Sequence, residues 1–193
     1  MNNVHPTVCK NIIIRSRQRG VGLLEVLVAL IVISFGVLGM AGLQLTGMKQ
    51  STSGFNRAKA VMLAESMTAR MRLNRTGVAN EFYNGFDSIN LSCDTQPDPY
   101  CQSYGATDAR ICTAEELADF DMFSVACGEW NGQSASGGIE EMLPDGASLA
   151  VSCDDVPCTN ESSYTLSVTW PENPNASSAE PTQSSRVQMR LRP

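Results

Sequence analysis

The chain has 193 residues, of which 42% are hydrophobic and 6% aromatic, so it suits one compact domain with an appended segment rather than two cores. Its formal net charge is −6, but the first 20 residues hold four basic groups and no acid, which leaves ten basic against 20 acidic groups in the rest. An acidic body does not gain free energy from counterion release when it meets phosphates, and this chain has few aromatic rings on which bases could stack. Both features argue against direct binding of nucleic acids or anionic lipids.

A basic leader, residues 1–20, comes first, and its charges are those of Lys10, Arg15, Arg17 and Arg19. An uncharged apolar run follows over residues 26–48, and as a helix it would be about 34 Å long, enough to cross a bilayer. Because the basic residues precede this run, we expect the leader to stay in the cytoplasm and the acidic body to face outward.

Two ordinary interpretations of the apolar run are open. A secretory signal peptide normally has 7–15 apolar residues and then a small-residue cleavage site, and neither feature is evident here. A plain signal anchor would place Glu25 at the membrane edge, where water reaches it.

A third interpretation follows from the stretch RGVGLLEVLVAL, which resembles the processing site of type IV prepilins. The resemblance implies that prepilin peptidase cuts after Gly20 and methylates the new amino terminus at Val21. It also makes Glu25 the glutamate that the family has at its fifth mature position. Two residues depart from the family pattern, since Val21 stands where Phe is commonest and Gly22 stands where Thr or Ser is usual. Both departures bear on the efficiency of cleavage or methylation.

Cleavage would explain why an acid is tolerated in this run. A carboxylate in hydrocarbon costs about 2.5–3.5 kcal/mol, and polar groups there usually have partners. A freed amine at Val21 would place a cation one turn from Glu25, and the resemblance implies that this glutamate pairs with the amino terminus of a neighbouring subunit. We therefore expect Leu23, Leu24, Glu25 and Val26 to contact other subunits, with apolar packing continuing to residue 45.

The helical pattern continues past residue 48 and becomes amphipathic, with apolar side chains at helical spacing: Phe55, Ala58, Met62, Ala69 and Leu73. We expect one helix from Leu23 to Leu73, about 75 Å long, with arginines in its last turn and Gly77 as its stop signal. Its first half would be membrane or fibre core and its second half would lie against a globular head, the ladle shape of type IV pilins.

Six of the seven cysteines lie in the body, at positions Cys93, Cys101, Cys112, Cys127, Cys153 and Cys158, whereas Cys9 lies in the leader. An even number without a C-x-x-C pair indicates disulfides formed in an oxidising compartment. A zinc site is the alternative, but it needs close thiolates or histidines, and the chain's one histidine is His5 in the leader. We expect Cys153 to pair with Cys158 across the short loop CDDVPC, and the other pairings stay open.

The head is predicted to be α+β. Residues 78–110 have little periodicity and are expected to form a long, disulfide-stapled loop. Thr113 and Glu116 have capping-box spacing before a helix that Cys112 and Cys127 bracket. The alternating segments ASLAVSC, SYTLSVTW and RVQMRLR predict an antiparallel sheet packed on the long helix, and a Pro/Ser/Asn loop separates the last two.

No catalytic constellation stands out. No histidine would survive cleavage, and nucleophile-elbow and phosphate-loop motifs are absent from the sequence. The acid pairs at 115–116 and 154–155 are typical of helix capping and solvated turns, and Asp154, Asp155, Asn160 and Glu161 lack the spacing of a calcium loop. We expect no enzymatic activity, no cofactor and no metal.

Phrases along the body, including AESMTARMRLNR and LPDGASLAVSC, resemble PilV-type minor pilins, also called type IV pilus modification proteins. This resemblance implies a minor pilin that initiates or modulates pilus assembly, and hence twitching motility, attachment or DNA uptake. Its partners would be other major and minor pilins, prepilin peptidase and the inner-membrane assembly platform, with the head in the periplasm. The expected parts are the leader 1–20, the membrane or pilus-core half 21–48, the amphipathic half 49–77 and the head 78–193.

Two alternatives to the minor pilin are open. A pseudopilin of a type II secretion system has the same N-terminal signal, so only the subgroup phrases distinguish it. A membrane-tethered binding module or adhesin that never polymerises would keep residues 1–20.

Overall fold

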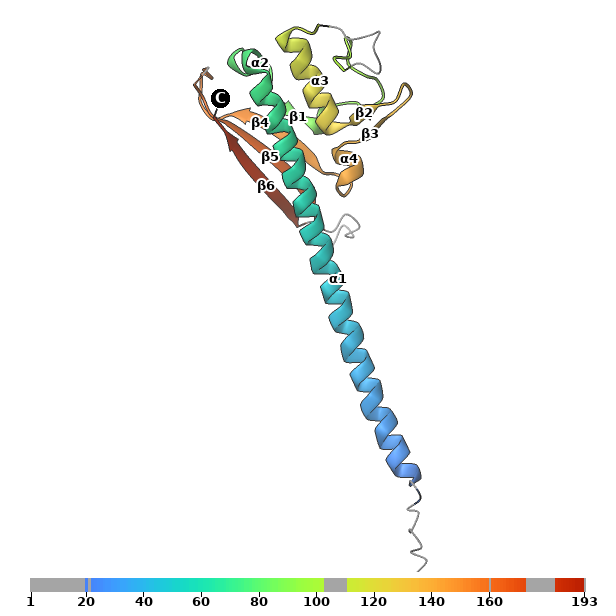
Figure 1. The fold of residues 1–193 in the computed structure, drawn as a ribbon. Helices are drawn as coiled ribbons and strands as arrows, with labels where there is room; N and C mark the ends of the chain where they lie inside the picture. Colours follow the sequence, from blue (N-terminus) through green and yellow to red (C-terminus); the bar gives the residue numbers. More distant parts are fainter. Residues whose placement is uncertain (1–19, 21, 103–110, 160, 173–182, 193) are drawn as a thin grey trace, which may run out of the picture. The chain divides into compact units, whose positions relative to one another are not determined.

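The computed structural model describes residues 20, 22–102, 111–159, 161–172 and 183–192. The chain divides into two compact units, Met1–Gly47 and Met48–Pro193, and each is described by itself. Helix α1 (Leu23–Leu73) contributes its first half to the first unit and its second half to the second (Figure 1). The bounds of this helix agree with the predicted ones.

The second unit is built around a four-stranded antiparallel sheet in the order β1-β4-β5-β6. Its strands are β1 (Phe86–Asp87), β4 (Ser148–Cys153), β5 (Tyr164–Pro171) and β6 (Ser184–Leu191). Every second residue of β5 is buried, as period-two alternation predicts, and Leu166 and Val168 lie opposite Val151 and Leu149 of β4. The three longer strands are those expected from the sequence.

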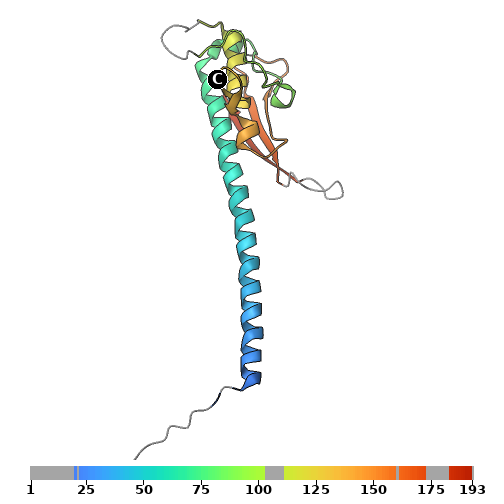
Figure 2. The same ribbon diagram turned by 90° about the vertical axis from the view of Figure 1, so that its right-hand side faces the viewer.

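The second half of α1 lies along one face of this sheet, as the two ribbon views show (Figures 1 and 2). The core contains Ala60, Leu63, Ala64, Met67 and Met71 of the helix together with alternate residues of the strands: Leu149, Val151, Tyr164, Leu166, Val168, Trp170, Val187 and Leu191. Two alanines one turn apart let the helix backbone approach the sheet closely. The fold class is therefore α+β, as predicted.

The remaining elements cover one end of this core. They are the helices α2 (Arg75–Ala79), η1 (Ser88–Asn90), α3 (Ala114–Ala126) and α4 (Ile139–Met142) and the hairpin strands β2 (Gly128–Trp130) and β3 (Ala135–Gly137). Helix α3 begins with the predicted capping box, in which Thr113 Oγ1 accepts from the Glu116 N–H while the Glu116 carboxylate accepts from the Thr113 N–H. Gly128 has a φ of +93°, and a β-carbon there would meet the backbone of Ser136.

Two expectations for the segment after α1 are wrong. Gly77 is not a stop signal, because it lies inside α2, and the break between the helices is at Asn74, whose ψ of 61° leaves the helical region. The Asn74 side chain accepts from the Gly77 N–H and lies so close that a β-carbon at residue 77 would be 2.4 Å from its amide nitrogen. The small residue is needed for this contact.

The described part of the expected loop, residues 78–102, contains short regular elements besides the two cysteines that form the predicted disulfide staples. Tyr83 is fully buried, β1 pairs with β4, and the Ser88 hydroxyl accepts from the backbone N–H of Leu149. Strands of two or three residues are too short to show alternation, so the sequence pattern does not reveal them.

Candidate functional site

The start of α1 contains the residues that the sequence singles out. Helix α1 begins at Leu23, and the backbone N–H groups of Glu25 and Val26 both donate to the Gly22 carbonyl, at 3.0 and 3.3 Å. Glu25 therefore lies in the first turn, where the helix dipole favours a negative charge. Val21 and residues 1–19 of the basic leader lie outside the described residues, so the pairing of the predicted amine with Glu25 stays a prediction.

Gly20 and Gly22 are both exposed, and a β-carbon at either position would meet no heavy atom within 4 Å. Neither has a φ in the left-handed region that favours glycine. Within the described residues, nothing in the fold requires glycine here. A requirement for a small residue at position 20 would therefore come from another molecule, such as an enzyme that must reach this backbone.

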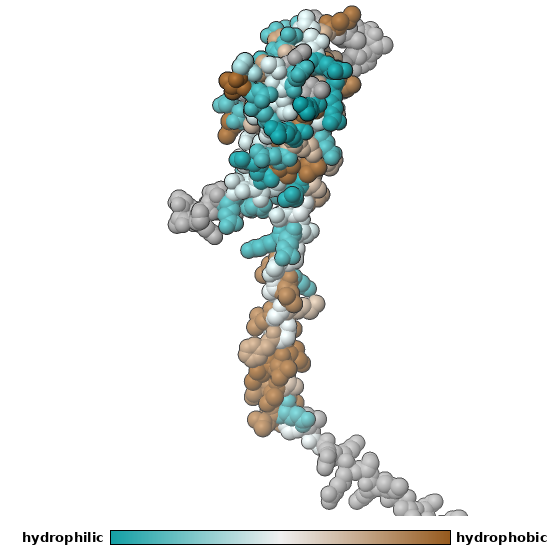
Figure 3. All heavy atoms as spheres, turned by 90° about the vertical axis from the view of Figure 1, so that its left-hand side faces the viewer, coloured by the Kyte–Doolittle hydropathy of each residue, from teal (hydrophilic) through white to brown (hydrophobic). Residues whose placement is uncertain are grey.

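The predicted contact residues Leu23, Leu24, Glu25 and Val26 are all exposed, and so is every described residue from 22 to 52. Helix α1 contains an 18-residue window with a mean hydropathy of 2.6 and no buried residue, which makes it long and apolar enough to cross a membrane. Figure 3 shows these apolar atoms gathered along the N-terminal half of the helix. Such a surface needs lipid or other protein chains as its environment.

Hydroxyl groups along this half are bonded within the helix. Ser34 Oγ donates to the Leu30 carbonyl at 2.7 Å, and Thr46 bonds in the same way to the carbonyl four residues before it, as does Thr52 just beyond this half. Because a bonded hydroxyl costs much less in an apolar environment than a free one, these residues do not prevent burial of the segment.

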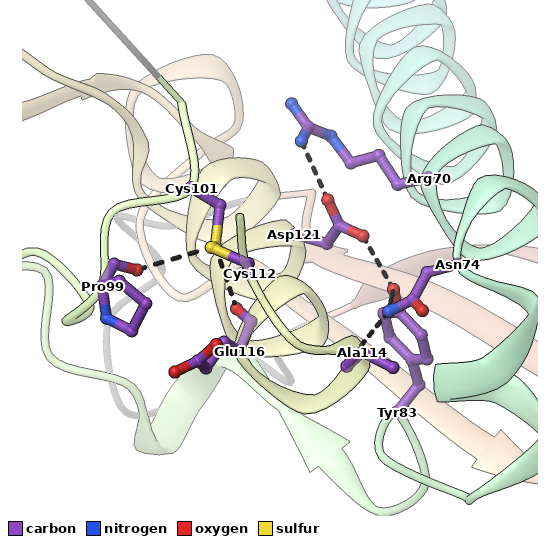
Figure 4. Close-up of polar contacts among 9 residues, drawn as sticks. All are labelled: Arg70, Asn74, Tyr83, Pro99, Cys101, Cys112, Ala114, Glu116 and Asp121. Atoms are coloured by element: carbon purple, nitrogen blue, oxygen red, sulfur yellow. Dashed lines mark hydrogen bonds and ion pairs between the residues drawn. A yellow bond between two sulfur atoms is a disulfide. The ribbon is translucent and has the colours of Figure 1, made fainter. Parts of the chain in front are cut away.

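The head contains a buried polar network that the sequence pattern did not reveal (Figure 4). The Asp121 carboxylate on α3 accepts from Arg70 of α1 at 3.1 Å and from the Tyr83 hydroxyl at 2.7 Å. The Asn74 amide donates to the Tyr83 oxygen at 3.0 Å and to the Ala114 carbonyl at 2.7 Å. The network connects the end of α1 and the turn before β1 to two points on α3, which are its first residue, Ala114, and Asp121 near its middle.

Burial dominates the titration of this network. It raises the pKa of the Asp121 carboxyl above its ordinary value, although the hydrogen bonds from Tyr83 and Arg70 act in the opposite direction. Burial and the neighbouring Asp121 carboxylate raise the pKa of the Tyr83 hydroxyl far above 10. Each group has a partner, and none lines the four cavities found among the described residues, so the network connects the helices through buried hydrogen bonds.

Three disulfides use the six cysteines of the body. Cys153 pairs with Cys158, which confirms that prediction, and the pairings that had been open are Cys93–Cys127 and Cys101–Cys112. The last two hold both ends of α3, since Cys112 precedes the helix and Cys127 is its C-cap (Figure 4 shows Cys101–Cys112). The bonds act as crosslinks for a region with little regular structure.

Three more acidic residues of the head have structural surroundings. Asp154 accepts from Thr165 and from Arg190, and these hydrogen bonds hold the pKa of its carboxyl below the ordinary value. Burial raises the pKa of the Asp119 carboxyl, and the Glu115 carboxylate in the first turn of α3 raises it further. Within the part of the chain that the structure describes, no group of three or more His, Cys, Asp or Glu side chains could hold a metal ion.

Comparison with known families gives two adjoining matches. The prokaryotic N-terminal methylation motif matches residues 15–41, and the family described as type IV pilin Tt1218 matches residues 42–123. The first match contains Gly20, Val21 and Glu25, and the second contains all residues of the network and the first three body cysteines. No curated protein and no solved structure matches the chain.

Proposed function

The chain belongs to the type IV pilins, and from this premise we propose that it is a minor pilin, cut by prepilin peptidase after Gly20 and methylated at Val21. The pilin family is structural, and a pilin role is what the two family matches support. The mature subunit would join other pilins through the first half of α1 and help to initiate or modulate pilus assembly. Twitching motility, attachment or DNA uptake would depend on it in turn.

The observation that carries this proposal is the state of the first half of α1. Every described residue from 22 to 52 is exposed, and the one ionisable group among residues 22–48 is Glu25 in the first turn. An apolar helix with an acidic residue at its start is stable only when other molecules cover its apolar side chains and a positively charged group pairs with the acid. Neighbouring subunits would supply both, the second through the methylated amine of Val21.

The cysteines support the same processing. Six of the seven form three disulfides in the body, and the seventh, Cys9, lies in the leader that cleavage would remove. Disulfides form in oxidising compartments such as the periplasm. We therefore place the head of this membrane-anchored pilin in the periplasm and the leader in the cytoplasm, with α1 in the inner membrane before assembly.

The family matches do not distinguish subgroups of pilins, so the assignment to a subgroup depends on short sequence phrases. The phrases AESMTARMRLNR and LPDGASLAVSC favour the PilV-type minor pilins over the pseudopilins of type II secretion. The predicted partners are accordingly major and minor pilins and the inner-membrane assembly platform.

Intact mass measurement tests the processing. The purified protein is expected to match residues 21–193 plus one methyl group and minus six hydrogens, and a strain without prepilin peptidase should yield the uncut chain. A mass that keeps residues 1–20 in the presence of the peptidase would instead support a tethered binding module.

Incorporation into pili tests the role of Glu25. E25A should be cut normally but be missing from sheared pili, since the acid has lost its contribution to subunit docking. The matched control is E65A, because Glu65 is an exposed glutamate of the same helix outside the apolar half. Normal incorporation of E25A would contradict the proposal. Intact pili with failed protein secretion in a deletion strain would assign the chain to a secretion system.

A further inference from the structure

Three arginines line one pocket of the head. The pocket has a volume of about 310 Å³ and lies where the end of α1, helix α2 and the end of β6 meet. Figure 1 shows the C-terminal end of β6 beside this end of α1. The lining residues are Met71, Arg72, Arg75, Val78, Leu191 and Arg192.

These arginines differ from others in the head. Arg70 is paired with Asp121 and Arg190 with Asp154. Arg72, Arg75 and Arg192 are exposed, and among the described residues none of them has an ion-pair partner. No acidic residue belongs to the lining, although acids outnumber basic groups two to one in residues 21–193.

The helix dipole does not account for this group. Arg72 lies in the last turn of α1, where a cation is favourable, but Arg75 begins α2 and Arg192 follows β6. Gathering three guanidinium groups around one pocket is unfavourable unless an anion is also present. The arrangement therefore fits a site whose ligand brings negative charge.

The floor of the pocket is apolar. Met71, Val78 and Leu191 are each at most 2% exposed, and they belong to the hydrophobic core. A guanidinium group presents a planar fork of donors that matches a carboxylate, and an apolar wall strengthens such an interaction by excluding water. A ligand that fills this site has an oxyanion attached to apolar carbon atoms.

We propose that this pocket binds the carboxylate side chains of an acidic peptide segment in a partner protein. A nucleic acid fits less well, because its affinity comes from many phosphate contacts along an extended basic surface, whereas here three cations stand on an acidic body. None of the lining side chains is aromatic, so no base can stack in the pocket. The inference rests on the pocket itself and does not depend on the proposed role in pilus assembly.

Fluorescence polarisation with the full chain in detergent micelles tests this inference. The probe is a peptide of sequence LEEL with blocked ends and an uncharged dye, and LQQL is the neutral counterpart. The triple variant R72Q/R75Q/R192Q should bind LEEL about tenfold more weakly or worse, since three charge-assisted contacts are lost. LQQL should bind the unaltered protein about tenfold more weakly than LEEL does, or worse.

The matched control is K49Q/R57Q/R186Q, which removes the same charge from exposed positions outside the pocket. It should bind LEEL within about twofold of the unaltered protein. An equal loss in this control would overturn the proposal in favour of a general charge effect. Near-ultraviolet circular dichroism should be unchanged in both triple variants, because all six side chains are exposed.

Competition identifies the class of ligand. Inorganic phosphate at the peptide's concentration and a twelve-residue oligothymidylate should both fail to displace LEEL. Displacement by phosphate would reduce the site to one for simple anions. Tighter, arginine-dependent binding of the oligonucleotide would assign the pocket to nucleic acid.

Discussion

The two halves of helix α1 are both rich in apolar residues but have opposite surroundings. From residue 23 to 47 every side chain is exposed, whereas Ala60, Leu63, Ala64, Met67 and Met71 of the second half are buried against the sheet. The second half finds its partner within the chain. The first half has none among the described residues, so its apolar surface is stabilised only by lipid or by other chains.

The sequence of each half matches these surroundings. The second half has an apolar stripe with polar residues between its members, which is typical of a helix on the surface of a globular head. Residues 26–48 are uncharged on all sides, which is typical of a helix surrounded by apolar material. The difference implies that changes in the head alter folding, while changes in the first half alter assembly. Five experiments test this separation.

Removing a long-range disulfide should have the largest effect on the head. C93S/C127S opens a crosslink between residues 34 apart, and the free energy of unfolding should fall by about 4 kcal/mol. C153S/C158S opens a loop of only 5 residues' separation and should cost about 2 kcal/mol. Urea unfolding of the full chain in detergent, followed by tryptophan fluorescence, measures both values. An equal loss in the two variants would show that the crosslinked loop length does not determine the effect.

A leucine in each unit gives the most direct comparison. L166A truncates a side chain that is fully buried between α1 and the sheet, and it should lower the free energy of unfolding by about 3 kcal/mol. L38A makes the same chemical change at a side chain that is 68% exposed, and it should change head stability by less than about 0.5 kcal/mol. A large loss in L38A would mean that the two units unfold together.

The Asp121 network should contribute an intermediate amount. D121A leaves the Tyr83 hydroxyl and the Arg70 guanidinium without their acceptor and should cost about 2 kcal/mol. The control D155A removes an exposed carboxylate and should have little effect.

Asp121 should also make the free energy of unfolding depend on pH. Since burial raises the pKa of Asp121, the folded protein holds this proton more tightly than the unfolded chain. The contribution of Asp121 to stability should therefore decrease as pH rises from about 3.8 through the higher folded pKa. D121N should lack this slope in urea unfolding measured across the range. A slope of opposite sign would mean that the ion pair with Arg70 outweighs burial.

The smallest effect is expected at Asp154. Its pKa is lowered by hydrogen bonds from Thr165 and Arg190, so its contribution is present above pH 3.8 and is lost as pH falls through the folded pKa. The Arg190 side chain is 72% exposed, and D154N should therefore cost less than about 1 kcal/mol at pH 7. D155N is the neighbouring control in the same titration. A difference between the two variants that persists at pH 2 would have another cause.

Patterns of a full helical turn or longer were predicted well. The bounds of α1, the capping box at Thr113, the three longer strands and the Cys153–Cys158 bond all follow from local spacing. These features depend on residues near one another in the chain, so their physical basis is visible in the sequence.

Features formed between distant segments were missed. Asp121 lies on the buried face of α3, where a charged residue is unexpected, and only the positions of Arg70 and Tyr83 explain it. The error at Gly77 is a local exception, because its role is a contact with Asn74 three residues before it and not a helix stop. The gathering of Arg72, Arg75 and Arg192 also depends on the sheet, which brings the end of β6 to the end of α1. The roles of Gly20, Val21 and Glu25 stay predictions.

The internally bonded hydroxyls of Ser34, Thr46 and Thr52 bear on how subunits find their alignment. With the hydroxyls of Ser34 and Thr46 bonded, Gln44 is the one other side chain among residues 26–48 with strong hydrogen-bonding groups, so most contacts of this segment are non-directional and would allow one helix to slide and rotate against another. In the proposed filament, the axial alignment of neighbouring helices would then depend on Glu25, because it carries the one charge among residues 22–48. Under the proposed function, a single charge on an otherwise apolar helix surface would let the subunit pass from bilayer to filament without rearranging the helix itself.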